Sequence, residues 1–142
     1  MATVAFKGAQ TLIQLGDGAS PEVFTTIGEV VSFGALGQRN DLIEVTHLLS
    51  TAKEYIGGLP DGVEIPVVCN YIPTNTQQVA MIAKVASGLS ANFKYKLPSG
   101  GGSLTFSFAA LVLGWNLPET TPNTATHVEF TLKITGSISG PV

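Results

Sequence analysis

The clearest pattern in the chain is an alternation of apolar and polar residues near its C-terminus. Every second residue from Val128 to Ile134 is apolar, and the residues between them are polar. A period of two is typical of a β-strand with one buried face and one polar face. We therefore expect a strand over residues 127–138, which is longer than the usual five or six residues.

A second alternating run covers residues 104–113. Its apolar face carries Phe106, Phe108, Ala110 and Val112. The end of this run is apolar on its other face as well, so we expect that end to be covered on both sides. Residues 90–97 precede it, and the glycine-rich stretch 98–102 joins the two runs, which predicts a β-hairpin.

Four further strands are predicted from short apolar runs bounded by glycine, proline and polar residues. They cover residues 10–15, 23–33, 42–48 and 63–71. Pro66 in the last run indicates a sheet edge or a bulge, because proline has no N–H to donate.

One α-helix is expected over about residues 74–87. Thr74 and Gln77 have the spacing of a capping box, and Gly88 has the place of a residue that ends a helix. A narrow apolar stripe at the helical period is formed by Val79, Ile82, Ala83 and Ala86.

Many alternating strands with one helix predict a mainly β fold, either a β-sandwich or a small barrel. The length of 142 residues favours one domain over residues 1–142, with a core of its own. A long loop arm at about residues 47–62 separates two predicted strands. Loops of this length are usually functional or disordered, and this one is too apolar for disorder.

The low content of charged residues indicates that the surface is unusual for a monomer. Only 12% of the residues are charged, against about 25% in ordinary domains, and the net charge is −3. So little charge is unfavourable for an isolated monomer, so we interpret much of the surface as contact with other protein. A surface solvated by serine, threonine, asparagine and glutamine is the alternative. Lys94 and Lys96 are the closest basic cluster, which is too small for a nucleic-acid reader.

Candidate residues for chemistry are sparse. The two histidines, His47 and His127, accompany no nucleophile elbow, and the chain has no C-x-x-C or H-E-x-x-H motif. The single Cys69 lies in an apolar run and is expected to be a small buried hydrophobe. No secretory signal or apolar run of membrane-spanning length is present. We expect no catalytic site, no metal, no cofactor and no membrane contact, and therefore no enzyme.

Residues 40–71 combine four features. A predicted strand has acidic residues on both sides of its apolar residues and ends in Val-Thr, and an arm with Ser50 and Glu54 follows it. A Gly-Leu-x-Asp-Gly turn then leads into a strand that ends in Asn-Tyr. This pattern, the helix that follows and the alternating last strand resemble the major tail-tube proteins of long-tailed, non-contractile bacteriophages. That family is similar in fold to the tubes of contractile tails and type VI secretion systems. The resemblance spans about residues 10–139.

The resemblance implies a structural subunit of a virion tail, made in the cytoplasm of a bacterial host. Such subunits join their sheets into rings, commonly of six, and the rings stack into a tube. The implied partners are further copies of the chain and other tail proteins, namely the tape measure, tail tip and terminator. Double-stranded DNA would pass through the lumen without specific binding. The alternatives are another tube or connector protein of this fold, such as a secretion-system tube or a tail terminator, and a small-ligand-binding β-barrel.

Expected assembly residues follow from this resemblance. In the arm they are Leu48, Leu49, Lys53, Glu54, Tyr55, Ile56 and Leu59. Ala2–Ala9 and Ser139–Val142 are further candidates for stacking contacts. Glu129, on the polar face of the last strand, is the candidate for the lumen, where negative charge would let DNA slide. Lys133 on the same face offsets part of that charge.

Overall fold

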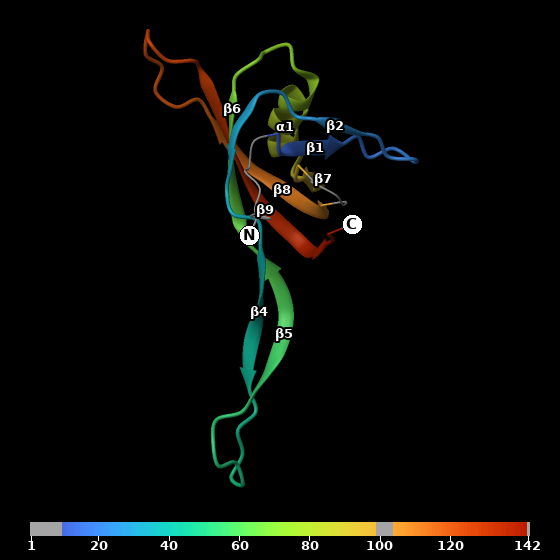
Figure 1. Cartoon of the computed structure of the whole chain (residues 1–142), viewed down its shortest axis with the longest axis vertical. Coiled ribbons are helices and arrows are strands. Elements are labelled where there is room, and N and C mark those ends of the chain that lie inside the picture. Colours follow the sequence, from blue (N-terminus) through green and yellow to red (C-terminus); the bar gives the residue numbers. More distant parts are fainter. Residues whose placement is uncertain (1–9, 99–103, 142) are drawn as a thin grey trace, which may run out of the picture.

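The computed structural model describes residues 10–98 and 104–141. Within these residues the chain forms nine strands and one helix (Figure 1). The strands are β1 (Leu12–Gly16), β2 (Phe24–Thr26), β3 (Val30–Phe33), β4 (Gln38–Glu44), β5 (Tyr55–Gly62), β6 (Glu64–Asn70), β7 (Ala91–Lys96), β8 (Thr105–Asn116) and β9 (His127–Ser139), and the helix is α1 (Thr76–Ser87). The predicted mainly β fold with one helix is confirmed. Residues 99–103, at the predicted tip of the β7–β8 hairpin, lie outside the described residues.

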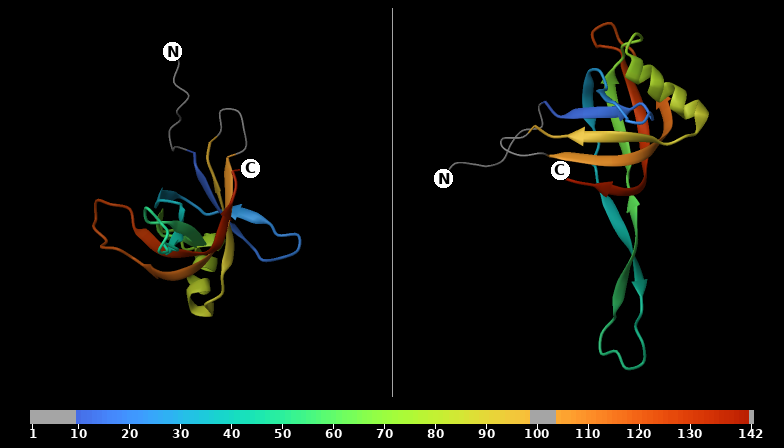
Figure 2. Two further views of the ribbon diagram at one scale, coloured as in Figure 1. Left: turned by 90° about the horizontal axis from the view of Figure 1, so that it is seen from below. Right: turned by 90° about the vertical axis from the view of Figure 1, so that its right-hand side faces the viewer.

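Seven of the strands form one antiparallel sheet in the order β2-β1-β7-β8-β9-β6-β3. The sheet curls until its two ends face each other (Figure 2). Phe33 of β3, the strand at one edge, and Tyr95 of β7, in the other half of the sheet, have ring centroids only 4.9 Å apart. The two halves of one continuous sheet therefore pack face to face, as the two sheets of a sandwich do. The edge strands β2 and β3 do not pair with each other, so the sheet does not close into a barrel.

The core lies between the facing halves of this sheet. The alternation in β9 predicts it correctly, because Val128, Phe130, Leu132 and Ile134 are all buried. From the opposite half of the sheet, Ile13 and Phe93 pack into the same cluster. Burial of side chains of this size contributes about 1.5–3 kcal/mol each, so this cluster is the main stabilising feature of the body.

The prediction of one strand over residues 23–33 is wrong, since the run is broken into β2 and β3. These two strands lie at opposite edges of the sheet. The Ile27 N–H donates to Ile13 in β1 at 2.8 Å, and the Glu29 carbonyl accepts from the Asn70 N–H at 3.0 Å. Glu29 has a φ of 46°, which turns the chain sharply. Three residues, 27–29, thus bridge the two ends of the sheet.

The helix begins later than predicted. Its N-cap is Asn75, whose side chain accepts from the Gln78 N–H at 3.0 Å, so the expected Thr74–Gln77 capping box is wrong. The left-handed Gly88 ends the helix as predicted. The predicted apolar stripe is largely on the wrong side of the helix. Val79, Ala83 and Ala86 are exposed, Ile82 is half-buried, and the fully buried helix residues are Gln78 and Met81.

Gln78 is buried because its amide is fully used. Its Nε2 donates to the carbonyls of Gly28 at 3.0 Å and Asn70 at 2.9 Å. Its Oε1 accepts from the Ile72 N–H at 2.9 Å. The side chain therefore ties α1 to the bridge at residues 27–29 and to the end of β6.

Strands β4 and β5 form a separate two-stranded sheet that projects from the body (Figure 1). The predicted loop over residues 47–62 is therefore wrong in its second half, because residues 55–62 are the second strand of a hairpin. The predicted strand 42–48 is also shifted, since β4 ends at Glu44. Pro60 lies in β5 opposite Asn40, where the open edges of a two-stranded sheet tolerate the missing N–H. We call residues 38–62 the arm.

The arm leaves the body where β5 continues into β6, with only Val63 between them. A Cβ atom at Gly62 would lie 2.4 Å from the Cβ of Ile134 in β9. Only glycine fits this close approach, so the arm starts tight against the sheet. Lys133 donates to the Gly62 carbonyl and, at 3.3 Å, to Asp61.

Replacing Gln78 with leucine should lower the free energy of unfolding by about 2–4 kcal/mol, because the half-buried carbonyls of Gly28 and Asn70 and the Ile72 N–H lose their partner. Urea unfolding measures this change. The matched control is Gln77→Leu, since Gln77 bonds only to the neighbouring Thr76 hydroxyl. The control should change stability by no more than about 0.5 kcal/mol. Equal midpoints for the two variants would contradict the role given to Gln78.

Candidate self-assembly interface

The arm carries many large apolar side chains with nothing over them in the described part of the chain. Leu48 is fully exposed, and Leu49 and Leu59 are 88% and 83% exposed. Leu42 is also exposed, on the opposite strand. A two-stranded sheet has open edges and two uncovered faces, so it has no core in which to bury such residues. Contiguous exposed apolar surface of this kind marks an interaction site.

The tip of the arm is an ordered turn. The Ser50 N–H donates to the His47 carbonyl at 2.9 Å, which places Leu48 and Leu49 at the two central positions. The Leu49 N–H donates to His47 Nδ1 at 3.2 Å, and the His47 N–H donates to Ser50 Oγ at 3.1 Å. The two leucines therefore project from a turn whose backbone is held by its own side chains.

Glu54 fixes this turn to the rest of the arm. Its carboxylate accepts from Ser50 Oγ at 2.6 Å and lies 3.5 Å from His47 Nε2. Its N–H donates to Thr46 Oγ1 at 2.9 Å, and its carbonyl accepts from the Val45 N–H at 2.9 Å. The strand ladder thus continues past the ends of β4 and β5, and Glu54 acts as a brace within the tip.

Serine, histidine and glutamate at one place raise the possibility of nucleophilic catalysis, but the arrangement does not fit it. A serine nucleophile must donate to an imidazole nitrogen, which then takes the proton. Here Ser50 donates to the Glu54 carboxylate instead. His47 Nδ1 accepts from the Leu49 N–H. The three side chains order a turn and do not form a catalytic relay.

The structure brings all the expected arm residues onto the arm. Leu48, Leu49, Lys53 and Glu54 lie at its tip, and Tyr55, Ile56 and Leu59 lie along β5, all exposed. Glu129 is elsewhere, half-buried in β9 between Val68 of β6 and Asn116 of β8. Their roles in assembly and in the lumen remain predictions. Ala2–Ala9 and Val142 lie outside the described residues.

A second apolar surface was missed. The expectation that the end of β8 is covered on both faces is wrong within the described residues, where Leu113 and Trp115 are 49% and 45% exposed. The reason is the length of β7, whose pairing with β8 stops at Ala110. Beyond that point β8 pairs only with β9 among the described strands, and Leu117 is also exposed just after it. In the sequence, the apolar residues on both faces of this run indicated that one face would be left for a contact with another molecule.

Cys69 is fully buried, and burial raises the pKa of its thiol to about 11. Because the thiolate is the reactive form, this cysteine is chemically inert in the folded protein. Among residues 10–98 and 104–141, no three histidine, cysteine, aspartate or glutamate side chains gather as metal ligands. In the same ranges, no helix is both long enough and apolar enough to cross a membrane.

Comparison with known proteins gives structural neighbours but no match to a family model or a curated protein. The chain is similar to one from the tail of an empty gene transfer agent particle with C6 symmetry, with a TM-score of 0.71, 20% identity, and coverage of 97% of this chain and 100% of that chain. It is similar to the SPP1 tail tube, with a TM-score of 0.72, 11% identity and coverage of 97% and 81%. A chain from the sheath/tube terminator of an extracellular contractile injection system has a TM-score of 0.73, 15% identity and 98% coverage of each chain.

These likenesses show that the chain has the fold of tail-tube proteins, which confirms the resemblance found in the sequence.

Replacing Glu54 with alanine should loosen the tip without weakening the body. The Leu49 and Ser50 amides should exchange with deuterium severalfold faster, since the turn loses its brace. The melting temperature should stay within about 2 °C, because the tip lies outside the core. Glu44→Ala, also on the arm, is the control and should leave both amides unchanged. Unchanged exchange in the Glu54 variant would show that the turn holds itself without Glu54.

Proposed function

We propose that the chain is the subunit of a phage-type tail tube, a structural protein that assembles with copies of itself into stacked rings. The observation that carries this proposal is the arm, an ordered hairpin that presents fully exposed leucines away from the body. A protein that worked as a monomer would gain nothing from holding such residues in water. The fold shared with a tail tube and a C6-symmetric tail supports rings of six.

Within a ring, we propose that neighbouring subunits meet through open sheet edges. The end of β8 beyond Ala110 has no partner from β7 and carries the exposed Leu113 and Trp115, so apolar surface can be buried in a contact there. The contact is heterologous, because β8 of one copy would meet a different edge of the next. Heterologous contacts generate rings when the rotation closes.

Between rings, we propose that the arm makes the contacts, through Leu48, Leu49, Lys53 and the exposed residues of β5. Glu54 orders the tip that presents them. The polar face of β9 with Glu129 would line a lumen through which double-stranded DNA leaves the virion. A net charge of −3 per copy supports a lumen that DNA does not bind. The proposed location is the virion tail, next to the tape measure, tail tip and terminator.

A second candidate is a tube or terminator subunit of a contractile injection system. The observation that favours it is the similarity to a chain from such a terminator structure over nearly the whole length of both chains. Both candidates require self-assembly through the same arm, and they differ in the cargo that passes through the tube.

Removing the tip should abolish assembly and leave the body folded. Glu44 and Tyr55 are paired in the arm, so an Asn-Gly turn can replace residues 45–54 between them. This variant should keep its free energy of unfolding within about 1 kcal/mol, because none of the removed residues belongs to the core. Sedimentation velocity over a concentration series should show it as a monomer where the unaltered chain forms large particles.

The side chains of the tip can be tested separately from its backbone. Leu48→Gln with Leu49→Gln keeps the turn and removes the apolar surface, and it should also prevent large particles. The matched control is Val79→Gln with Leu89→Gln, two exposed apolar residues on the body. Normal assembly of the tip variant, or equal loss in the control, would contradict the role of the arm.

A further inference from the structure

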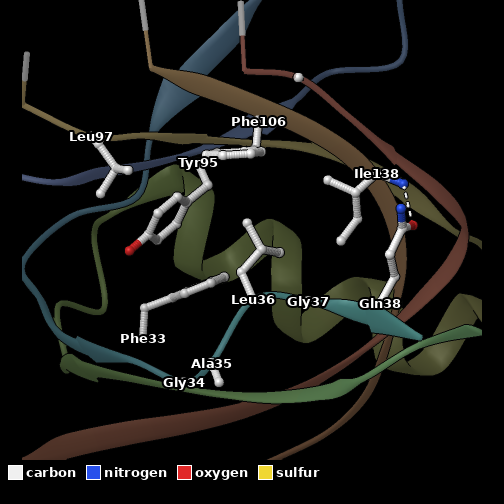
Figure 3. A pocket seen from close by; sticks show the side chains of 11 residues that line it. Phe33, Gly34, Ala35, Leu36, Gly37, Gln38, Tyr95, Leu97, Phe106 and Ile138 are labelled. Carbon is white, nitrogen blue, oxygen red and sulfur yellow. Dashed lines mark hydrogen bonds between the residues drawn. The ribbon is translucent and has the colours of Figure 1, made fainter.

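A cavity at one end of the curled sheet is unused by the function proposed above. It has a volume of about 540 Å³. The segment between β3 and β4 forms one wall, and the ends of β7, β8 and β9 form the other (Figure 3). Phe33, Leu36, Tyr95 and Ile138 point into the same space from these walls.

The lining of this cavity selects an apolar occupant. None of the described residues that line it is charged. Its apolar side chains Phe33, Leu36, Leu97, Phe106 and Ile138 are each only half-buried, because they face the cavity. A small-ligand site also needs a few convergent polar groups that fix orientation. Gln38 Oε1 is already used by the Ile138 N–H at 3.0 Å, so the polar groups that remain on the described lining side chains are Gln38 Nε2 and the Tyr95 hydroxyl.

The tip of the arm has the matching properties. The two central residues of its turn, Leu48 and Leu49, are apolar and lie almost completely in water. The hydrogen bonds of His47, Ser50 and Glu54 order this turn before any contact is made. A preorganised apolar projection loses little conformational entropy when it is buried in a partner.

The tip cannot fill the cavity of its own chain. Gln38 lines the cavity and is also the first residue of the arm. An extended strand rises about 3.3 Å per residue, so the tip lies on the order of 30 Å from the cavity, at the other end of the arm. Any contact between the two must therefore join different copies, and each copy carries one tip and one cavity.

We propose that Leu48 and Leu49 at the arm tip of one copy insert into the 540 Å³ cavity between residues 33–38 and the ends of β7, β8 and β9 of a second copy. This inference rests on the proposed function and adds the surface that receives the arm. Because tip and cavity are separated along the direction of the arm, the contact repeats by translation. Repeated heterologous contacts of this kind build open filaments, which is the geometry that stacked rings require.

Cysteine pairs test this contact directly. The single natural cysteine, Cys69, is fully buried and unreactive, so it does not interfere. The test variant combines Leu49→Cys with Ala35→Cys, an exposed residue of the cavity wall. Assembled protein is oxidised mildly and run on a non-reducing gel, where a ladder of covalent multimers is expected. The control combines Leu49→Cys with Val79→Cys on the exposed side of α1 and should give no ladder.

The outcomes separate the inference from the proposed function. Two results would contradict insertion into the cavity but not self-assembly. One is that the variant with cysteines at positions 49 and 35 assembles without forming covalent multimers. The other is that the control with cysteines at positions 49 and 79 forms covalent multimers to the same extent. Failure of the unaltered chain to assemble at any concentration would overturn both.

An apolar dye gives a second test that needs no cysteine. Nile red should bind the cavity of the tip-deleted monomer and lose most of its fluorescence enhancement when Leu36, which points into the cavity, is replaced in Leu36→Trp. Assembled unaltered protein should exclude the dye, because tips occupy the cavities. Equal dye binding in the assembled and tip-deleted proteins would contradict the inference.

Discussion

The fold depends on the point where the two ends of the curled sheet meet. Residues 27–29 cross from one end to the other, and the buried amide of Gln78 holds this bridge to the last residue of β6 and to the start of the helix. A buried amide with all its partners satisfied fixes one arrangement, whereas apolar packing alone tolerates many. The curl in turn creates the open end where the cavity lies.

The same body leaves the arm free to make contacts elsewhere. Strand β5 runs into β6 across a single residue, so the arm is rooted in the middle of the folded chain and not at a loose terminus. Gly62 packs against Ile134, and Lys133 bonds to Asp61, which together fix the direction in which the arm leaves the sheet. Beyond this root the arm has only its own ladder and the turn at its tip. The body therefore supplies the stability, and the arm supplies exposed apolar surface in a defined position.

The sequence predicted the elements whose periodicity is set by one buried face. Strands β8 and β9 follow this rule, and their predicted buried faces are correct except at Phe106, which is half-buried beside the cavity. Strand β5 was mistaken for a loop because both of its faces are exposed, so no alternation marks it as a strand, and β4 was predicted with shifted bounds. The helix was placed on the wrong face because a polar residue, Gln78, occupies the most buried position. The expected arm residues were found by resemblance, whereas the cavity combines segments distant in sequence that only the fold brings together.

The most direct test of the account is electron microscopy of the purified chain over a range of concentrations, alone and after addition to preformed phage tails. The account predicts hollow tubes of stacked rings, with density for the arm running from each ring to the next. It also predicts that added chain lengthens preformed tails. A protein that stays monomeric at every concentration and adds to no tail would contradict the central claim that this fold exists to assemble with copies of itself.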